Sequence, residues 1–378
     1  MRATVDALYV HVPFCWRVCG YCDFYSEVFD RPRIEPLVDA LGRELDSYRA
    51  RVDLRPRTIF IGGGTPTTLP PPTLARLLAA CRQDARTGPD FEFTVEANPA
   101  TVTPAIAETL AAGGVTRVSI GAQSFDPAEL AILDRQHRPE QVAQTVATCR
   151  EHGLTHISLD LIFAIPGQTL AGWRANLRTA LELDPEHLSC YGLTYEPGTP
   201  LHERWQAGAV QRVDSDVEAD MYEATIDDLA AAGLPQYEIS NYARPGAECR
   251  HNLVYWRNEP YLGIGPSAAG FVDETRYRNV PDTAAYVAAI TAGRSPRVEE
   301  ERLDPLARQR ETAMLGLRLR AGIDRAAFRA RFGVDATDTF ATVIARYVAD
   351  ELLEVTDTHI RLTRRGVLVA DRVAADFL

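Results

Sequence analysis

Short runs of β-branched and aromatic residues alternate with helical patterns over the first half of the chain. The runs start near six residues: Ala7, Thr58, Phe91, Arg117, His156 and His187. Helical patterns fill most of the intervals, at residues 35–51, 72–85, 104–112, 139–152 and 170–183. This alternation predicts an α/β fold with a parallel sheet and helical crossovers. Six strand–helix units fit before residue 194, fewer than the eight of a complete barrel, so the pattern indicates an open sheet or a partial barrel.

The second half of the chain is less regular and ends in a different pattern. A helix is expected at residues 216–232 and a strand at 236–242. From about residue 299, helices at 304–320, 324–332 and 339–350 precede a β-type segment at 353–362 and a terminal helix. Three helices and a β-ribbon indicate a small winged-helix-like α+β domain. We therefore expect a core at residues 1–235, a connecting region at 236–298 and a C-terminal domain at 299–378.

Composition excludes several classes of function. All 40 basic residues are arginine, so no lysine can form a Schiff base, hold pyridoxal phosphate or complete a Walker A motif. The net charge is −12, and residues 299–378 carry 13 arginines against 14 acidic residues, which argues against nucleic-acid binding. No apolar run approaches the ~18 residues of a transmembrane segment, and no secretory leader is recognisable. We expect a cytoplasmic protein with reduced thiols.

Three cysteines lie directly after the first predicted strand, at Cys15, Cys19 and Cys22. A C-x3-C-x2-C spacing on one short loop can wrap a single compact centre, and thiolates are the usual ligands of iron–sulfur clusters. With only three protein ligands, one iron of a cubane would stay open to another molecule. The alternative is a zinc site in which His11 supplies the fourth ligand.

Glycine-rich and polar segments follow the later predicted strands. Residues 62–66, Gly-Gly-Gly-Thr-Pro, lack the features of a P-loop, but bare backbone there lets a small ligand approach closely. Polar side chains recur at or near later strand ends, at Glu96, Gln123, Arg135 and Asp160. Because barrel sites gather at the carboxyl ends of strands, these side chains are expected to converge over one cavity.

The cysteine spacing resembles that of the radical S-adenosylmethionine (SAM) superfamily. This resemblance implies a six-unit partial barrel and a [4Fe-4S] cluster on the three cysteines, whose open iron binds SAM. The motifs starting at Tyr9, Gly62, Glu96, Gly121 and Asp160 look like the coproporphyrinogen-oxidase-like branch of that superfamily. By this resemblance, the SAM contacts are expected at Tyr9, Tyr21, Gly64, Thr65, Pro66, Glu96, Gln123, Arg135 and Asp160.

Two functions share this branch, an oxygen-independent oxidase that decarboxylates coproporphyrinogen and a heme chaperone. The oxidase continues with a fourth cysteine two residues after the third, whereas this chain reads Cys22-Asp23-Phe24. The chain also begins only eight residues before Tyr9, without the oxidase's N-terminal extension. Both features favour the heme-chaperone group over the alternative, a coproporphyrinogen III oxidase.

A second motif, around residues 249–256, points in the same direction. It resembles the H-N-x-x-Y-W motif associated with heme binding, here His251, Asn252, Tyr255 and Trp256. An imidazole is a good axial ligand for heme iron and aromatic rings can cover a porphyrin face, so His251 is expected to ligate heme iron, with Cys249 as a rival.

The sequence therefore predicts a heme chaperone with radical SAM machinery, whose net function is heme binding and transfer rather than oxidation. Its cofactors would be a [4Fe-4S] cluster, SAM and heme as cargo. Its partners would be an electron donor to the cluster and a heme-acceptor protein such as a membrane respiratory enzyme. If no cluster is present, the alternative prediction is a zinc-stabilised α/β binding protein.

Overall fold

The computed structural model describes residues 4–378, which form two compact units. The first unit contains the residues up to 225 and the segment 260–301. The second contains residues 226–259 and 302–378. The expected C-terminal boundary at residue 299 lies near the chain's last passage between units, and the expected connecting region, 236–298, is divided between them. Within the described range, no helix is long and apolar enough to cross a membrane.

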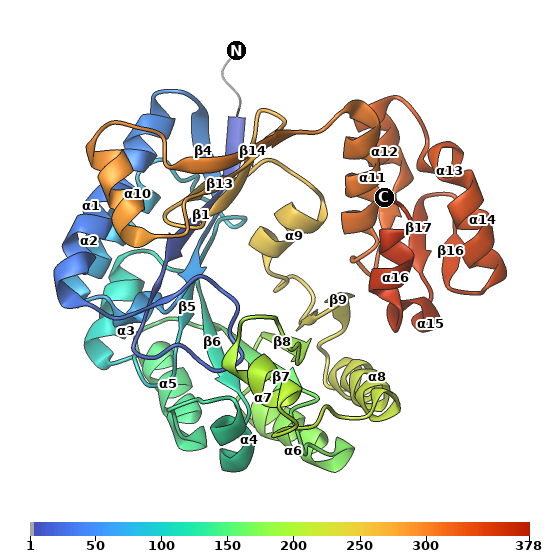
Figure 1. The fold of residues 1–378 in the computed structure, drawn as a ribbon, viewed down its shortest axis with the longest axis horizontal. Coiled ribbons are helices and arrows are strands. Elements are labelled where there is room, and N and C mark those ends of the chain that lie inside the picture. Colours follow the sequence, from blue (N-terminus) through green and yellow to red (C-terminus); the bar gives the residue numbers. More distant parts are fainter. Residues whose placement is uncertain (1–3) are drawn as a thin grey trace. The chain divides into compact units, whose positions relative to one another are not determined.

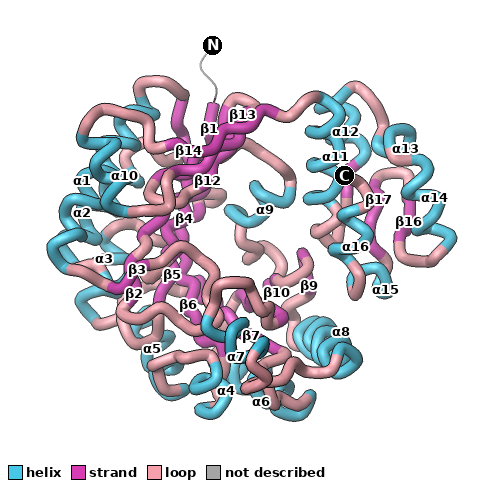
Figure 2. The backbone as a smooth tube through the Cα atoms, viewed as in Figure 1, coloured by secondary structure: helices cyan, strands magenta, loops and turns pink. Residues whose placement is uncertain are grey.

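A parallel sheet forms the centre of the first unit (Figures 1 and 2). All six predicted strands are present: β1 (Thr4–Val12), β4 (Asp53–Gly63), β5 (Glu92–Ala97), β6 (Arg117–Gln123), β7 (His156–Phe163) and β8 (His187–Gly192). They follow one another in that spatial order, and each pairs in parallel with the next. The predicted partial barrel is thereby confirmed.

Helices connect the strands and pack on the outer side of the sheet (Figure 1). Those predicted from sequence are α1 (Arg31–Arg49), α2 (Pro71–Arg82), α3 (Pro104–Ala112), α5 (Pro139–Glu151) and α6 (Leu170–Glu182). A proline in the first turn costs no hydrogen bond, and it opens α2, α3 and α5. Thr103 also caps α3, because its hydroxyl oxygen accepts the Ile106 N–H at 3.3 Å. These local signals explain why the helix starts were predictable.

A seventh strand, β11 (Leu262–Ile264), returns late in the sequence and pairs in parallel with β1. Sequence analysis did not predict it, since it is only three residues long and contains a glycine. It is followed by a three-stranded sheet and a helix, which lie in the same unit up to residue 301: β12 (Ala269–Val272), β13 (Thr275–Asn279), α10 (Thr283–Thr291) and β14 (Arg297–Arg302).

A buried carboxylate on α1 fastens this return segment to the barrel. Glu44 accepts hydrogen bonds from the Gly265 N–H at 2.9 Å, the Asn279 amide at 2.9 Å and the Tyr286 hydroxyl at 2.5 Å. Burial raises the pKa of the Glu44 carboxyl, and these three donors offset part of that cost. The bonds hold β11 beside β1, where the candidate site begins.

The second unit combines a short hairpin and helix with the C-terminal domain. Its first part holds β9 (Gln236–Glu238), β10 (Asn241–Ala243) and α9 (Arg250–Trp256); the single strand expected at 236–242 is thus two antiparallel strands. The boundary between the two units lies within helix α8 (Ser215–Ala231), whose residues from 226 onward belong to the second unit. The C-terminal domain comprises α11 (Pro305–Gly316), β15 (Ile323–Asp324), α12 (Arg325–Phe332), α13 (Ala336–Thr339), α14 (Ala341–Ala349), β16 (Leu353–Val355), β17 (His359–Leu362), α15 (Arg364–Val367) and α16 (Ala370–Ala375). The helix expected at 339–350 is divided at Phe340 into α13 and α14.

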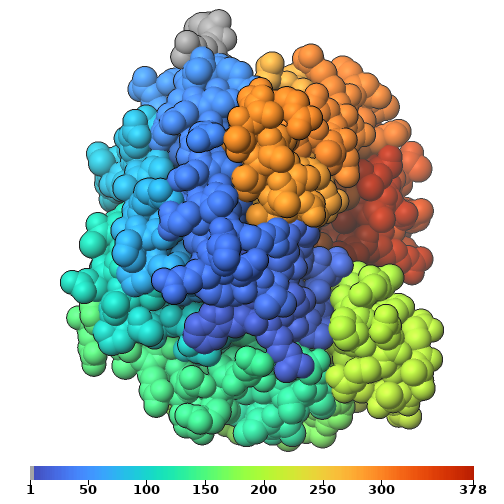
Figure 3. Space-filling view, turned by 60° about the vertical axis from the view of Figure 1, so that its left-hand side comes forward, coloured from blue at the N-terminus to red at the C-terminus, as the bar shows by residue number. Residues whose placement is uncertain are grey.

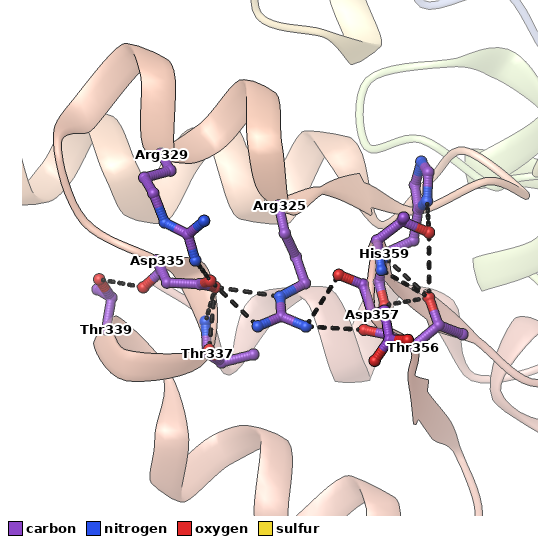
Figure 4. A network of polar contacts seen from close by, with 9 residues as sticks. Arg325, Arg329, Asp335, Thr337, Thr339, Thr356, Asp357 and His359 are labelled. Carbon is purple, nitrogen blue, oxygen red and sulfur yellow. Dashed lines mark hydrogen bonds and ion pairs between the residues drawn. The ribbon is translucent and has the colours of Figure 1, made fainter.

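One aspartate organises the centre of the C-terminal domain (Figure 4). Asp335 is buried and caps α13 by accepting the Thr337 N–H at 2.9 Å. Its carboxylate forms ion pairs with both Arg325 and Arg329. Arg325 also donates to the Thr356 carbonyl at 2.8 Å, which ties α12 to the loop between β16 and β17. Hydrogen bonds from Arg325 hold the pKa of Asp335 well below its usual range.

We expect Asp335→Ala to destabilise the second unit selectively. It removes a helix cap, a loss of at least about 1 kcal/mol, and leaves two arginines without their shared acceptor. Because the folded-state pKa is depressed, the aspartate's contribution is present at neutral pH and is lost as the pH falls below the usual aspartate range. Urea unfolding at neutral pH measures the effect. An unchanged midpoint would contradict it.

Candidate functional site

The loop that carries the three cysteines is held at several points in the barrel unit. Strand β2 (Phe14–Cys15) pairs with β3 (Glu27–Val28), and the Phe29 N–H donates to the Cys15 carbonyl at 2.7 Å. The Cys22 N–H donates to the Cys19 carbonyl at 3.2 Å, and the Leu201 N–H to the Gly20 carbonyl at 2.8 Å. All three cysteines are half-buried. The dark blue N-terminal segment forms part of the surface seen in Figure 3.

The thiols lie among groups that can stabilise thiolates. Arg135 Nη1 donates to Cys19 Sγ at 3.5 Å, and Cys15 Sγ lies 3.5 Å from the Thr65 hydroxyl. Burial raises the pKa of Cys15, and raises that of Cys22 to about 11. A bound metal reverses this preference, because it deprotonates a coordinating thiol. The loop therefore suits metal ligation rather than thiol nucleophilic chemistry.

His11, the fourth ligand of the zinc alternative, is engaged elsewhere. Its Nδ1 lies 2.9 Å from the Tyr9 hydroxyl and its Nε2 lies 2.8 Å from the Tyr25 carbonyl oxygen. Burial lowers the pKa of His11 to about 4, so the ring is neutral. Across residues 4–378, no three His, Cys, Asp or Glu side chains converge closely enough for a single metal ion. A zinc site that used His11 would therefore have to break one of these two hydrogen bonds.

Gly63, the last residue of β4, and Gly64 bring the second loop against the cysteine loop. Gly63 has φ +102°, and a Cβ there would lie 2.4 Å from the His11 ring. A Cβ on Gly64 would lie 2.6 Å from the Pro13 carbonyl carbon. The Gly64 N–H donates to the Val12 carbonyl at 2.8 Å, which places bare backbone beside the cysteines. Only glycine permits both contacts.

Two partly buried carboxylates lie in the same region, on β5 and β7, with β6 between them. Glu96 at the end of β5 accepts the Gly63 N–H at 3.1 Å, and its pKa is raised to about 7 by burial and then by the charge of Asp160. Asp160 on β7 accepts the Ser119 hydroxyl at 3.1 Å and has a pKa raised mainly by burial. A cationic ligand would relieve both charges.

Gln123 and Arg135 form the next part of the site. Gln123 has φ +66°, at a bulge where the pairing of β6 with β7 shifts after Gly121. Arg135 Nη2 donates to the Gly121 carbonyl at 2.5 Å. Among the described residues, buried Arg135 Nε has no hydrogen-bond partner. An unsatisfied buried donor beside the thiols could pair with a ligand's acceptor.

Tyr21 provides an apolar wall next to these polar groups. It packs against a buried cluster formed by Leu133, Ile162, Ile165, Leu193, Tyr195 and Leu201. The sequence did not reveal this cluster, because its members come from separate segments with no common motif. The wall can receive the flat, uncharged part of a ligand whose charged end meets the carboxylates.

The second predicted motif forms α9 in the second unit. His251 is fully buried, its Nε2 lies 2.9 Å from the Tyr255 hydroxyl, and the two rings meet edge to face. Burial lowers the pKa of His251 to about 3, which leaves a neutral imidazole. Asn252 and Trp256 lie on the same helix and are partly buried. Cys249, the rival ligand, is buried at the start of the helix, where its N–H donates to the Tyr237 hydroxyl at 3.3 Å.

The fold and the cysteine site define a radical SAM protein, as comparison with known proteins also finds. Residues 9–180 match the Radical SAM superfamily, and residues 303–369 match the HemN C-terminal domain. A solved structure of coproporphyrinogen III oxidase (HemN) from Escherichia coli has the same fold, with a TM-score of 0.85 at 22% identity over 100% of this chain and 90% of that one.

Curated relatives narrow the class to one family. Heme chaperone HemW of Bacillus subtilis is 35% identical over 99% of both chains. Heme chaperone HemW of Mycobacterium tuberculosis is 37% identical over 98% of this chain and 94% of the relative. Radical S-adenosyl methionine domain-containing protein 1, mitochondrial, of Danio rerio is 32% identical over 85% of this chain and 74% of the relative. The chain belongs to the HemW family.

The raised pKa of Glu96 predicts that the cluster-free protein loses stability as the pH rises. Since the folded-state pKa of about 7 lies above the usual 4.5, folding is disfavoured as the pH rises and Glu96 ionises in its buried position. Glu96→Gln keeps an acceptor for the Gly63 N–H but does not ionise. Between about pH 5.5 and about pH 8, the wild type should lose about 2 kcal/mol more stability than Glu96→Gln.

Denaturant unfolding of cluster-free protein at the two pH values measures this difference. Every other titrating group is the same in the two proteins, so the difference between their pH dependences reports on Glu96. Equal pH dependence in the two proteins would show that Glu96 has an ordinary pKa.

Proposed function

We propose that this chain is a heme chaperone that binds heme and transfers it to an acceptor protein. The observation that carries the proposal is the full-length similarity to Heme chaperone HemW, at 35% identity over 99% of both chains. The Cys22-Asp23-Phe24 sequence, without a fourth nearby cysteine, supports the same function.

In this proposal Cys15, Cys19 and Cys22 hold a [4Fe-4S] cluster. Their thiols come from one anchored loop, Arg135 donates toward Cys19, and its Nε still lacks an acceptor among the described residues. When bound, such a cluster supplies an open iron for a chelating ligand and an electron for its cleavage. Arg135 would stabilise the negative charge of the thiolates.

The residues around the loop suit SAM. Its sulfonium and ammonium charges match the ionised forms of Glu96 and Asp160, and Tyr21 offers an apolar surface to its adenine. The close backbone contact at Gly64 brings the loop after β4 directly against the cysteine loop. The remaining proposed contacts are Tyr9, Thr65, Pro66, Gln123 and Arg135.

Heme binding is assigned to α9, with His251 as the iron ligand and Asn252, Tyr255 and Trp256 supporting the porphyrin. The neutral imidazole is the form that ligates iron. In the structure its Nε2 is bonded to the Tyr255 hydroxyl, so iron must replace that hydrogen bond. Binding through Nε2 therefore requires α9 to expose a side chain that is now buried.

The partners follow from the same proposal. A reduced cluster requires an electron donor, and heme delivery requires an acceptor protein, for which we propose a membrane respiratory enzyme. All seven cysteines are free thiols, which suits a reducing compartment such as the cytoplasm.

Each of Cys15→Ser, Cys19→Ser and Cys22→Ser should abolish the broad iron–sulfur absorbance of anaerobically reconstituted protein. Loss of one thiolate leaves the cubane with too few protein ligands. Cys81→Ala, a buried cysteine on α2, is the matched control and should keep the wild-type spectrum. Full iron and sulfide content in Cys19→Ser would refute the assignment.

His251→Ala should weaken heme binding by roughly tenfold or more, corresponding to about 1.4 kcal/mol, and should alter the Soret band. The cluster spectrum should persist, because its ligands lie on another segment. His359→Ala is a control from the same unit, since the His359 ring bonds to the hydroxyl of its neighbour Thr358. A folded His251→Ala protein with wild-type affinity and spectrum would assign the iron to another ligand, Cys249 first.

With SAM and reductant under anaerobic conditions, the protein should form no protoporphyrinogen from coproporphyrinogen. The measurement is product analysis by chromatography beside a heme titration of the same preparation. Stoichiometric product would replace the chaperone proposal by the oxidase function.

A further inference from the structure

Helix α9 is fastened to the C-terminal domain at the end that carries Trp256. Just after the helix, the Asn258 amide donates to Glu311 Oε2 at 3.1 Å and to the Thr312 hydroxyl at 2.9 Å, both on α11. Arg331 on α12 donates to the Arg257 carbonyl at 3.3 Å. The helix with the proposed heme ligand and the C-terminal domain therefore belong to one structural unit.

An arginine of this domain covers the Trp256 ring. Arg318, two residues after α11, holds its guanidinium carbon 4.8 Å from the centre of the indole ring. Its Nη1 pairs with Asp371 at 2.9 Å, but that aspartate side chain is 90% exposed, so the pair contributes little. The exposed Asp371 therefore compensates the charge of Arg318 only weakly.

Two buried donors at this place have no acceptor. Over the whole described chain, Trp256 Nε1 and Arg318 Nε are among the buried polar atoms without a hydrogen-bond partner. Glu238 is the buried carboxylate whose charge interacts with Arg318; its Oε1 accepts from the Ser240 N–H at 3.1 Å and from Asn241, within its own hairpin, and its Oε2 is also a buried atom without a hydrogen-bond partner among the described residues. Buried N–H groups without an acceptor are costly, and a ligand's oxygen atoms would satisfy them.

We infer that Arg318 and Trp256 form a carboxylate-binding site for a propionate of the heme cargo. The inference rests on the proposed heme function and adds residues that the α9 motif does not contain. An arginine fork matches the two oxygens of a carboxylate, and the indole supplies both a second N–H donor and an apolar face for the porphyrin. The C-terminal domain thereby becomes part of the heme site.

The test uses the full-length protein, with ferric heme and heme dimethyl ester as the two probes. The ester lacks free carboxylates but keeps the iron and the porphyrin face. Wild-type protein should bind free-acid heme roughly tenfold more tightly than the ester. Arg318→Gln should bind both probes with similar affinity. Trp256→Phe, which keeps an aromatic face but removes the N–H donor, should reduce the preference for the free acid.

Arg346→Gln is the matched control. Arg346 lies in the same unit, pairs with Asp376 and stacks 4.5 Å from the centre of the Tyr347 ring, but it is not part of the α9 contacts. It should keep the wild-type preference. Circular dichroism checks folding, and if Arg318→Gln does not fold, the wild-type preference and Trp256→Phe decide the question.

The outcomes separate this inference from the proposed function. If the wild type binds neither probe, the heme function fails. If it binds heme but shows no preference for the free acid, or if folded Arg318→Gln keeps the preference, the carboxylate site is wrong and the heme function stands.

Discussion

Direct backbone contact between two loops determines where the barrel site can form. The Gly64 and Thr65 N–H groups each donate at 2.8 Å, to the carbonyls of Val12 and Phe14, so the loop after β4 continues the pairing beyond β1. A side chain at position 64 would collide with Pro13 and open this contact. The cysteines, Glu96 and Arg135 lie around this backbone contact. The rest of the site depends on two chain segments meeting without intervening side chains.

The parallel register explains why polar residues far apart in sequence converge. Glu96 on β5 pairs with Ser119 on β6, and Gly121 on β6 pairs with Asp160 on β7. Since all carboxyl ends point to one edge, side chains near those ends can reach the same space. This geometry also concentrates buried negative charge, which a cationic ligand would offset. Burial, and then the charge of Asp160, raise the pKa of Glu96.

Much of the barrel was predictable because its signals are local. Six buried strands, proline-started helices and the C-x3-C-x2-C spacing can each be read over a few residues. The seventh strand could not be predicted, because its three residues are held beside β1 by Glu44, more than 200 positions earlier in the chain. The same applies to the Tyr21 wall, whose members share no motif. The motif at residues 251–256 predicted that His251 ligates heme iron, but nothing in the sequence indicates that the imidazole is fully buried.

The function proposed for this chain is to carry heme to another protein. The most direct measurement mixes heme-loaded protein with membrane vesicles that contain a heme-depleted respiratory enzyme, and follows recovery of that enzyme's heme spectrum. The account predicts that the enzyme gains heme as the chain loses it, faster than a passive heme scavenger such as albumin removes heme from the same loaded protein. Recovery no faster than release to albumin would contradict the account, since heme would then leave by simple dissociation.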